Sequence, residues 1–258
     1  MTLTIITVNL NNKDGLIQTL NSISSQDYQD FEHIVIDGQS SDGSQEIIKQ
    51  NKRINHWISE LDTGVYDAMN KGIELAKGEY LLFLNSGDYL VDDNVLKTVI
   101  STVHTEDIIY GNLLINEKDT KKEYYYPSKL TFDFMFDYSL GHPCTFIKKT
   151  LFDRVGLYNT NHKIISDWIF FVNALVRCNA SVRYIKDIIS VFNTDGMSSK
   201  PENIESINNE RIAFLKSEYA VLYHDYIKFR QINYILQRIK SSKGYKWLKA
   251  LGIKKFQY

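Results

Sequence analysis

Residues 62–88 read DTGVYDAMNKGIELAKGEYLLFLNSGD and contain one helix followed by one strand. Apolar spacing predicts a helix over residues 65–76, and Gly78 follows it as a stop signal. Residues 80–84 form an apolar run of strand length, which the polar residues 85–88 end. This stretch therefore predicts a buried strand that delivers a polar turn at its carboxyl end.

The residues before this stretch repeat the same alternation of strand, polar loop and helix. Residues 3–8 and 33–36 are short apolar strands, each followed by a polar loop and helical spacing, and a weaker strand is expected at residues 56–58. Such alternation predicts a mostly parallel sheet with helices on both faces. Ligands of these sheets bind beyond the carboxyl ends of the strands. The polar residues at those ends are Asn9, Asp37, Asp62 and residues 85–88.

The second half of the chain predicts a mixed α+β region and then helices. We expect helices at residues 92–104 and 166–178, strands at 108–115, 124–126 and 145–148, an extended segment at 182–192 and helices from Pro201 onward. No internal repeat interrupts this order.

Composition and charge exclude several classes of protein. The 258 residues are 43% hydrophobic, and 30 basic against 31 acidic residues give a net charge of −1, which argues against nucleic acid as a partner. Two cysteines without a CxxC pair indicate a reducing compartment, so we expect a cytoplasmic protein. Residues 3–8 lack a basic leader and a cleavage site, and no apolar run reaches the roughly 18 residues of a membrane span.

Phosphate-binding loops of the common kinds are absent from the sequence. Neither GxGxxG nor GxxxxGK[ST] occurs, which disfavours a dinucleotide site and a P-loop. A nucleotide bound at the strand ends would need a metal ion or basic side chains to neutralise its phosphates.

Three blocks of sequence carry a resemblance to a known family. They are TIITVN at residues 4–9, IVIDGQSSDGS at residues 34–44, and the stretch at residues 62–88; a looser fourth block runs from His142-Pro143 through Gly156-Leu157-Tyr158 to Ser166-Asp167-Trp168. The chain resembles family 2 glycosyltransferases of the GT-A fold, of the bacterial polysaccharide-assembly type. The resemblance implies a catalytic domain at residues 1–200, with a nucleotide-binding half at 1–90 and an acceptor-binding half at 91–200. Residues 201–258 would be a helical, basic extension.

The resemblance implies roles for residues at the strand ends. A nucleotide-diphosphate sugar would lie there, with Thr7 and Asn9 lining the nucleotide pocket and Asp37 accepting a hydrogen bond from a base N–H, which suits uracil or guanine. Asp62 and Lys71 would complete the base and phosphate contacts. Without the resemblance, Asp37 could equally well make only an Asx turn with Gly38, and a lysine such as Lys71 on a helix is usually a solvated charge.

The metal motif of the family departs from its usual form in this chain. Its Asp-x-Asp pattern is replaced by Asn85-Ser86-Gly87-Asp88, which leaves Asp88 as the expected ligand of Mn²⁺ or Mg²⁺. One carboxylate, two phosphates and waters can satisfy such an ion. Asn85 would face the ribose, and Gly87 would lie beside the donor.

The fourth block implies the groups that handle the acceptor. An inverting transfer needs a general base, and the resemblance assigns this role to Asp167, with His142 and Trp168 on the acceptor side. Each has a structural alternative: Asp167 could cap a helix, His142 could be structural and Trp168 could belong to the core.

The end of the chain has a charge of its own. Residues 228–258 hold nine basic residues and no acidic one, which leaves 21 basic against 31 acidic in residues 1–227, and aromatic residues are interleaved with the basic ones. An amphipathic cationic helix of this kind favours an anionic membrane surface, here the inner face of the cytoplasmic membrane beside a lipid-linked acceptor. Packing on the acidic body of the chain or on a second subunit of a homodimer is an equal alternative.

The sequence therefore carries one main hypothesis and two rivals. The main one is an inverting, metal-assisted transfer of a hexose or aminohexose from a nucleotide-diphosphate sugar, UDP-linked, to a saccharide or lipid-linked acceptor of surface polysaccharide. The first rival is a catalytically weak sugar-nucleotide-binding or scaffold subunit, because the metal motif lacks its usual carboxylates other than Asp88. A nucleotidyltransferase is a distant second rival, disfavoured because no glycine-rich basic loop follows the first strand.

Overall fold

The computed structural model describes residues 2–101, 105–117, 120–196 and 199–251 of the 258-residue chain. The chain divides into two compact units, residues 1–204 and residues 205–258. Unit 1 holds the sheet and the helices around it, and unit 2 is helical.

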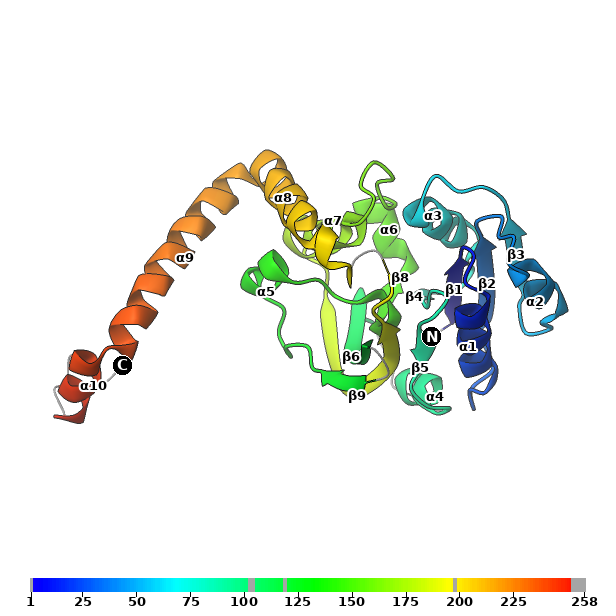
Figure 1. The fold of residues 1–258 in the computed structure, drawn as a ribbon, viewed down its shortest axis with the longest axis horizontal. Helices are drawn as coiled ribbons and strands as arrows, with labels where there is room; N and C mark the ends of the chain where they lie inside the picture. The colour runs from blue at the N-terminus through cyan, green and yellow to red at the C-terminus, as the bar shows by residue number, and fades with distance from the viewer. Residues whose placement is uncertain (1, 102–104, 118–119, 197–198, 252–258) are drawn as a thin grey trace. The chain divides into compact units, whose positions relative to one another are not determined.

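A mixed, mostly parallel sheet forms the centre of unit 1 (Figure 1). Its order is β3-β2-β1-β4-β8-β6-β9-β5, and β7 pairs with β6. Pairing is parallel for β1 with β2 and β4, for β2 with β3 and for β6 with β9, whereas β8 runs antiparallel to β4 and β6. The strands are β1 (Leu3–Asn9), β2 (Glu32–Asp37), β3 (His56–Ser59), β4 (Tyr80–Phe83), β5 (Tyr89–Leu90), β6 (Ile108–Glu117), β7 (Thr120–Tyr124), β8 (Thr145–Lys148) and β9 (Val182–Asn193). The expected sheet class is confirmed.

Helices cover both faces of the parallel half of the sheet. On one face, Leu16 and Leu20 of α1 (Lys13–Ser24) and Ile48 of α2 (Ser44–Gln50) form a buried cluster with Val35 of β2. On the other face, α3 (Val65–Leu75) comes so close to β1 that a Cβ atom on Gly72 would lie 2.5 Å from Ile6 Cγ2. Glycine at this position therefore sets the distance between helix and sheet.

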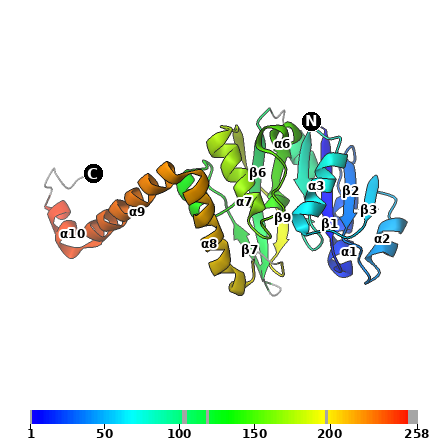
Figure 2. The same ribbon diagram turned by 90° about the horizontal axis from the view of Figure 1, so that it is seen from above.

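The remaining helices of unit 1 follow β5 in the sequence, and Figure 2 shows α6 and α7 next to β6. They are α4 (Val95–Ile100), α5 (Phe132–Asp137), the 3₁₀ turn η1 (His142–Cys144), α6 (Lys149–Val155), α7 (Ser166–Val172) and the π-helical turn η2 (Asn173–Arg177). The helix expected at residues 92–104 begins later, at Val95, because Asp92 accepts the Asn94 N–H in a turn before α4, and residues 102–104 of that expectation lie outside the described residues. The helix expected at 166–178 changes to π-helical bonding after Val172, and the strand expected at 124–126 ends at Tyr124.

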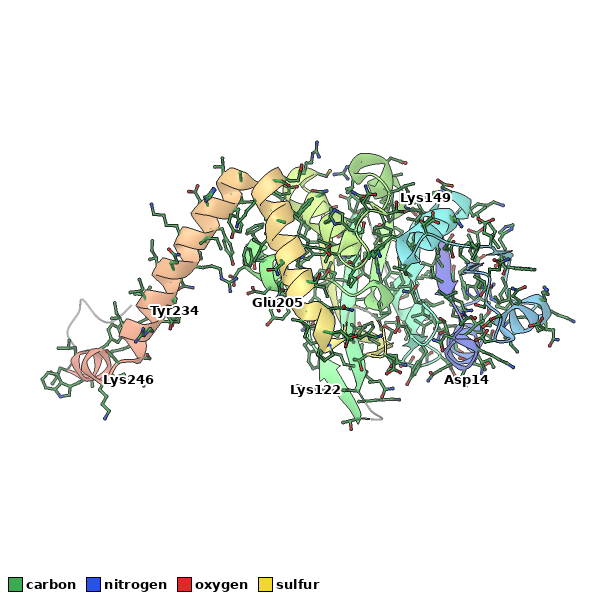
Figure 3. The ribbon with its side chains drawn as sticks, turned by 45° about the horizontal axis from the view of Figure 1, so that its top comes forward. Asp14, Lys122, Lys149, Glu205, Tyr234 and Lys246 are labelled. Atoms are coloured by element: carbon green, nitrogen blue, oxygen red, sulfur yellow. The ribbon has the colours of Figure 1, made fainter. Side chains whose placement is uncertain are left out.

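Unit 2 consists of α9 (Ala220–Ser241), α10 (Lys243–Ala250) and most of α8 (Pro201–Glu218). Figure 3 shows side chains projecting from α9 and α10, with Tyr234 and Lys246 labelled. In the described part of the chain, no helix has the length and apolar character to cross a membrane. Of the expected basic tail, Lys254, Lys255, Phe256 and Tyr258 lie outside the described residues.

Candidate functional site

The carboxyl ends of β1, β2 and β4 meet at one edge of the sheet, because these strands are parallel neighbours. Hydrogen bonds join the loops that follow them. The Gly38 N–H donates to the Asn9 carbonyl at 2.8 Å, and the Asn12 amide donates to the Ser86 carbonyl at 2.9 Å. The residues predicted to hold the donor therefore belong to one connected edge, as expected for ligand sites of such sheets.

Thr7, Asn9 and Asp37 lie beneath this edge and are at most 1% exposed. Thr7 Oγ1 is bonded to His33 Nε2 at 3.1 Å, and burial, with a smaller contribution from Arg53, lowers the pKa of His33 to about 3, so its ring is neutral. The structure thus places all three predicted nucleotide contacts in the wall of the site, where none presents a side chain to solvent.

Both carboxylate oxygens of Asp37 are engaged within the protein. Oδ1 accepts from Asn9 Nδ2 at 2.8 Å and from Ser40 Oγ at 2.6 Å, while Oδ2 accepts from Ser40 N at 3.0 Å and from Ser59 Oγ at 2.7 Å. These four bonds fill the acceptor capacity of a carboxylate. In this structure Asp37 fixes the loops of β1, β2 and β3, and a bond to a base would require one of the four to be exchanged.

Lys71 lies in an acidic cluster at the first turns of α3. Its Nζ is 2.6 Å from Asp62 Oδ1, 2.8 Å from Glu60 Oε1 and 3.8 Å from Asp67 Oδ2. Burial acts to lower the pKa of Lys71, but the bonds to Asp62 and Glu60 outweigh it and raise that pKa. The structure brings Asp62 and Lys71 into contact with each other, and it commits the Lys71 charge to carboxylates instead of leaving it open for a phosphate.

The turn after β4 presents Asn85, Gly87 and Asp88. Gly87 has a φ of +105°, a conformation that favours glycine, and its N–H donates to Thr19 Oγ1 at 3.0 Å. Thr19 Oγ1 also donates to the Asp88 carbonyl at 2.7 Å, so α1 holds this turn in place. The turn is therefore built to keep Asp88 at a fixed position.

Asp88 is a buried carboxylate whose pKa is strongly raised. Its side chain accepts the Asn193 N–H at 3.0 Å from the end of β9. Burial raises the pKa of Asp88 to about 7, and the bond from Asn193 opposes this only in part. No cationic side chain of the described residues contributes to the shift. A carboxylate of this kind is expected where a bound cation would supply the missing positive charge.

The protein donors for a divalent cation are few. Within the described residues there is no group of three or more His, Cys, Asp or Glu side chains placed to hold a metal ion. Asn85 Oδ1, three residues before Asp88, is buried without a hydrogen-bond partner in the described structure. The Asp88 carboxylate by itself fits an ion that takes its remaining oxygen ligands from phosphates and water, which leaves the Asn85 amide oxygen for another polar group.

Asp167 lies in the first turn of α7 and is partly exposed. Its Oδ1 is 2.9 Å from the hydroxyl oxygen of Tyr66, which is also 2.6 Å from the Ile164 carbonyl oxygen. Ile165 is the residue that precedes the helix, and it makes no side-chain cap. The structure therefore shows Asp167 bonded through Oδ1 to a residue 101 positions away, on α3.

His142 and Trp168, the predicted acceptor-side residues, are both buried. His142 Nε2 is bonded to Tyr158 Oη at 2.8 Å, and burial lowers the pKa of His142 against the opposing charge of Asp167. Trp168 is 0% exposed and donates from Nε1 to the Met135 carbonyl at 2.6 Å. The expected acceptor-facing wall is therefore not formed by Trp168, which instead ties α7 to α5 through the core.

The residues that hold Asp167 and Asp88 in place were not among those predicted from the sequence. Tyr66 and Asn70 stand four positions apart on α3, a spacing that places them on one face and was visible in the sequence. Asn70 makes two bonds to the Tyr158 main chain, at 2.8 and 3.0 Å. Asn193 donates its N–H to Asp88 from 105 positions away, and no local sequence pattern indicated this contact.

Comparison with known sequences gives a family match. The sequence model described as Glycosyl transferase family 2 matches residues 4–172. A PGL/p-HBAD biosynthesis glycosyltransferase of Mycobacterium bovis is 29% identical over 202 residues, which is 74% of this chain and 77% of that protein. Glycosyltransferase GlyG of Streptococcus pneumoniae is 27% identical over 222 residues, with 69% of this chain and 73% of that protein covered.

Comparison with solved structures shows the same fold. The S. aureus TarS 1-349 structure in complex with UDP-GlcNAc superposes with a TM-score of 0.67 at 20% identity, covering 84% of this chain and 67% of that one. The mannosyltransferase PcManGT from Pyrobaculum calidifontis, in complex with GDP-Man and Mn²⁺, gives a TM-score of 0.58 at 14% identity, covering 76% of this chain and 58% of that one.

Proposed function

This chain belongs to glycosyl transferase family 2, and on that premise we propose that it is an inverting glycosyltransferase of surface polysaccharide biosynthesis. It transfers a hexosyl or N-acetylhexosaminyl group from a UDP-linked sugar to a saccharide or lipid-linked acceptor. The observation that supports this most strongly is the buried Asp88, which the turn after β4 holds with a pKa of about 7 and which no basic side chain of the described residues neutralises.

The donor is proposed to lie across the ends of β1, β2 and β4. Asp88 would hold Mn²⁺ or Mg²⁺ together with the diphosphate, and Asn85 Oδ1 would accept a hydrogen bond from the ribose. An ion held there by Asp88 would supply positive charge against the negative charge of the departing diphosphate. Asp37, Asn9 and Thr7 act by fixing the loops on which the base rests, and Leu10, 63% exposed beside Gly38, offers an apolar surface to the base.

Asp167 is proposed as the general base. Its oxygen that faces away from Tyr66 takes the proton of the acceptor hydroxyl while the acceptor oxygen attacks the anomeric carbon. The bond between the anomeric carbon and the diphosphate oxygen breaks on the opposite side, so the configuration inverts. His142, neutral and buried, supports the acceptor side through Tyr158.

The donor class is tested by a thermal-shift panel of UDP, GDP, dTDP and CMP, each with Mn²⁺ or with EDTA. A ligand that binds the folded state raises the melting temperature by mass action. We expect a shift with UDP that requires Mn²⁺. A shift with another nucleotide would correct the donor, and a shift that survives EDTA would remove the metal from the proposal.

A turnover assay separates the enzyme from the rival of a sugar-nucleotide-binding subunit. Release of UDP from UDP-sugars is measured with a panel of saccharide and lipid-linked acceptors, and the anomeric configuration of the product is read by NMR. Acceptor-dependent release with an inverted product is expected. Donor binding without release for any acceptor would favour the binding subunit.

Residues 228–251 are proposed to dock the enzyme on an anionic membrane surface, at the inner face of the cytoplasmic membrane. The apolar residues Phe229, Ile232, Ile235, Ile239 and Trp247 are between 50% and 64% exposed on α9 and α10. Basic residues accompany them, and no acidic residue follows Asp225. Exposed apolar and basic side chains together suit a surface of anionic lipid.

Vesicle binding tests this docking against the alternative of a homodimer. The variant Lys243→Glu, Lys246→Glu and Lys249→Glu is expected to bind anionic vesicles on the order of 100-fold more weakly, at about 1 kcal/mol per basic residue. Glutamate at the exposed Lys52, Lys77 and Lys163 of unit 1 is the matched control. Equal binding by both variants would contradict membrane docking, and a dimer that this tail variant dissociates would support the alternative.

A further inference from the structure

We propose that Tyr66 is a positioning residue for Asp167: its hydroxyl group orients the ionised carboxylate before the proton transfer and turns away once the carboxyl group is protonated. This inference rests on the proposed role of Asp167. Tyr66 is 6% exposed in the first turn of α3, and its hydroxyl oxygen lies between two acceptors, Asp167 Oδ1 at 2.9 Å and the Ile164 carbonyl oxygen at 2.6 Å.

The two acceptors give the single Tyr66 proton a partner in both states of the base. A tyrosine hydroxyl carries one hydrogen and rotates to suit its surroundings. When Asp167 is ionised, the hydroxyl donates to Oδ1 and leaves the other carboxylate oxygen for the acceptor hydroxyl. Once Asp167 has received the acceptor's proton, the Tyr66 hydroxyl turns to the Ile164 carbonyl and releases the carboxyl group. Tyr66 keeps its own proton throughout.

The position of Tyr66 is fixed from several sides. Asn70, one turn further along α3, makes its two bonds to the Tyr158 main chain, and the rings of Tyr66 and Tyr158 lie 5.5 Å apart. The Tyr158 hydroxyl is in turn bonded to His142. The close approach of Gly72 to Ile6 fixes α3 on the sheet. The hydroxyl of Tyr66 therefore cannot move away from Asp167 without disturbing the packing of α3.

Among the described residues, the charge of Asp167 acts on the pKa values of three titratable groups, and all three are neutral near pH 7. Burial and the charge of Asp167 raise the pKa values of Tyr66 and Tyr158 well above their usual range. Burial lowers the pKa of His142. Among the described residues, no ion pair with a basic side chain involves Asp167. Orientation of the carboxylate therefore depends on the hydrogen bond from Tyr66.

The variant Tyr66→Phe tests the proposal, because it removes one oxygen atom and keeps the ring. Tyr80→Phe is the matched control, because Tyr80 is also buried and its hydroxyl donates to the Glu106 carbonyl at 2.6 Å. Tyr80 is the first residue of β4, and the candidate site lies at the other end of this strand. We expect Tyr66→Phe to lower kcat about 10- to 100-fold, the usual effect of losing a bond to a charged group, with the donor KM within about twofold. The acid limb of the kcat profile should move to higher pH, because the ionised base has lost a donor.

A double variant separates failure of this inference from failure of the proposed function. Tyr66→Phe should cause no further loss in a chain that already carries Asp167→Asn, because the two residues act as one unit. Wild-type kcat and pH profile in Tyr66→Phe would overturn the positioning role, as would equal losses in Tyr66→Phe and Tyr80→Phe. Full activity of Asp167→Asn alone would overturn the proposed base, whatever Tyr66→Phe does.

Discussion

Replacing Asp88 by asparagine is expected to stabilise the fold at alkaline pH while it removes the proposed metal ligand. The pKa of Asp88 is about 7 in the folded chain, against an ordinary value of 3.8. Between these two values the folded chain binds more protons than the unfolded chain, so stability falls as the pH rises through this window. Above pH 7 the buried charge costs roughly 4 kcal/mol, at 1.36 kcal/mol per pKa unit.

Asparagine cannot ionise, and its amide oxygen can still accept the Asn193 N–H. Because the buried amide keeps a polar cost of its own, we expect Asp88→Asn to raise the free energy of unfolding by about 2 to 4 kcal/mol at pH 8 in EDTA. For a unit of this size the melting temperature would rise by roughly 5 to 15 °C. The advantage should shrink to less than half at pH 5, where the wild-type carboxyl group is largely protonated.

Thermal and urea unfolding at pH 5 and pH 8 measure this effect, with Asp153→Asn as an exposed control that should change little. The same Asp88 variant should lose the Mn²⁺-dependent part of any nucleotide shift. A variant that is no more stable than the wild type at pH 8, or that shows the same pH dependence, would refute the assignment of Asp88 as a destabilising buried charge.

Two further substitutions test the packing that holds the site. Gly78→Ala should destabilise the fold by about 2 kcal/mol, because its Cβ would lie 2.5 Å from the Thr4 backbone nitrogen, while Gly244→Ala, with open space around it, should be neutral in the same urea titration. Asn70→Ala should cost about 2 kcal/mol, since it removes both bonds to the Tyr158 main chain, and kcat should fall as well. Unchanged urea midpoints in Gly78→Ala or Asn70→Ala would count against these contacts.

The parallel half of the sheet was predictable from sequence because its signals are local. Strands β1, β2 and β4 each contain an apolar run followed by polar residues, and the helices between them show regular apolar spacing, whereas the signal for β3 was weaker. Parallel pairing then places the ends of β1, β2 and β4 together without further information. The sequence alone therefore predicted a candidate site at these strand ends.

The depth of the side chains at the site was not predictable in the same way. Polar residues at strand ends were expected to face a ligand, yet Thr7 and Asp37 are buried because each is bonded to a neighbouring strand or loop. Trp168 was expected on the acceptor side, and it is instead a core residue bonded to the Met135 carbonyl. The burial of these three side chains depends on contacts between residues 22 to 33 positions apart in the sequence, and no local sequence pattern encodes such contacts.

Turnover of Asp167→Asn tests the account most directly. Asparagine keeps the size of the side chain and cannot take a proton from the acceptor, so kcat should fall by about 10²-fold or more while the affinity for UDP-sugar in Mn²⁺ stays within about twofold. Donor affinity is measured by calorimetry and kcat by acceptor-dependent UDP release, on protein of unchanged melting temperature. A kcat equal to that of the wild type would contradict Asp167 as the base and, with it, the proposed mechanism.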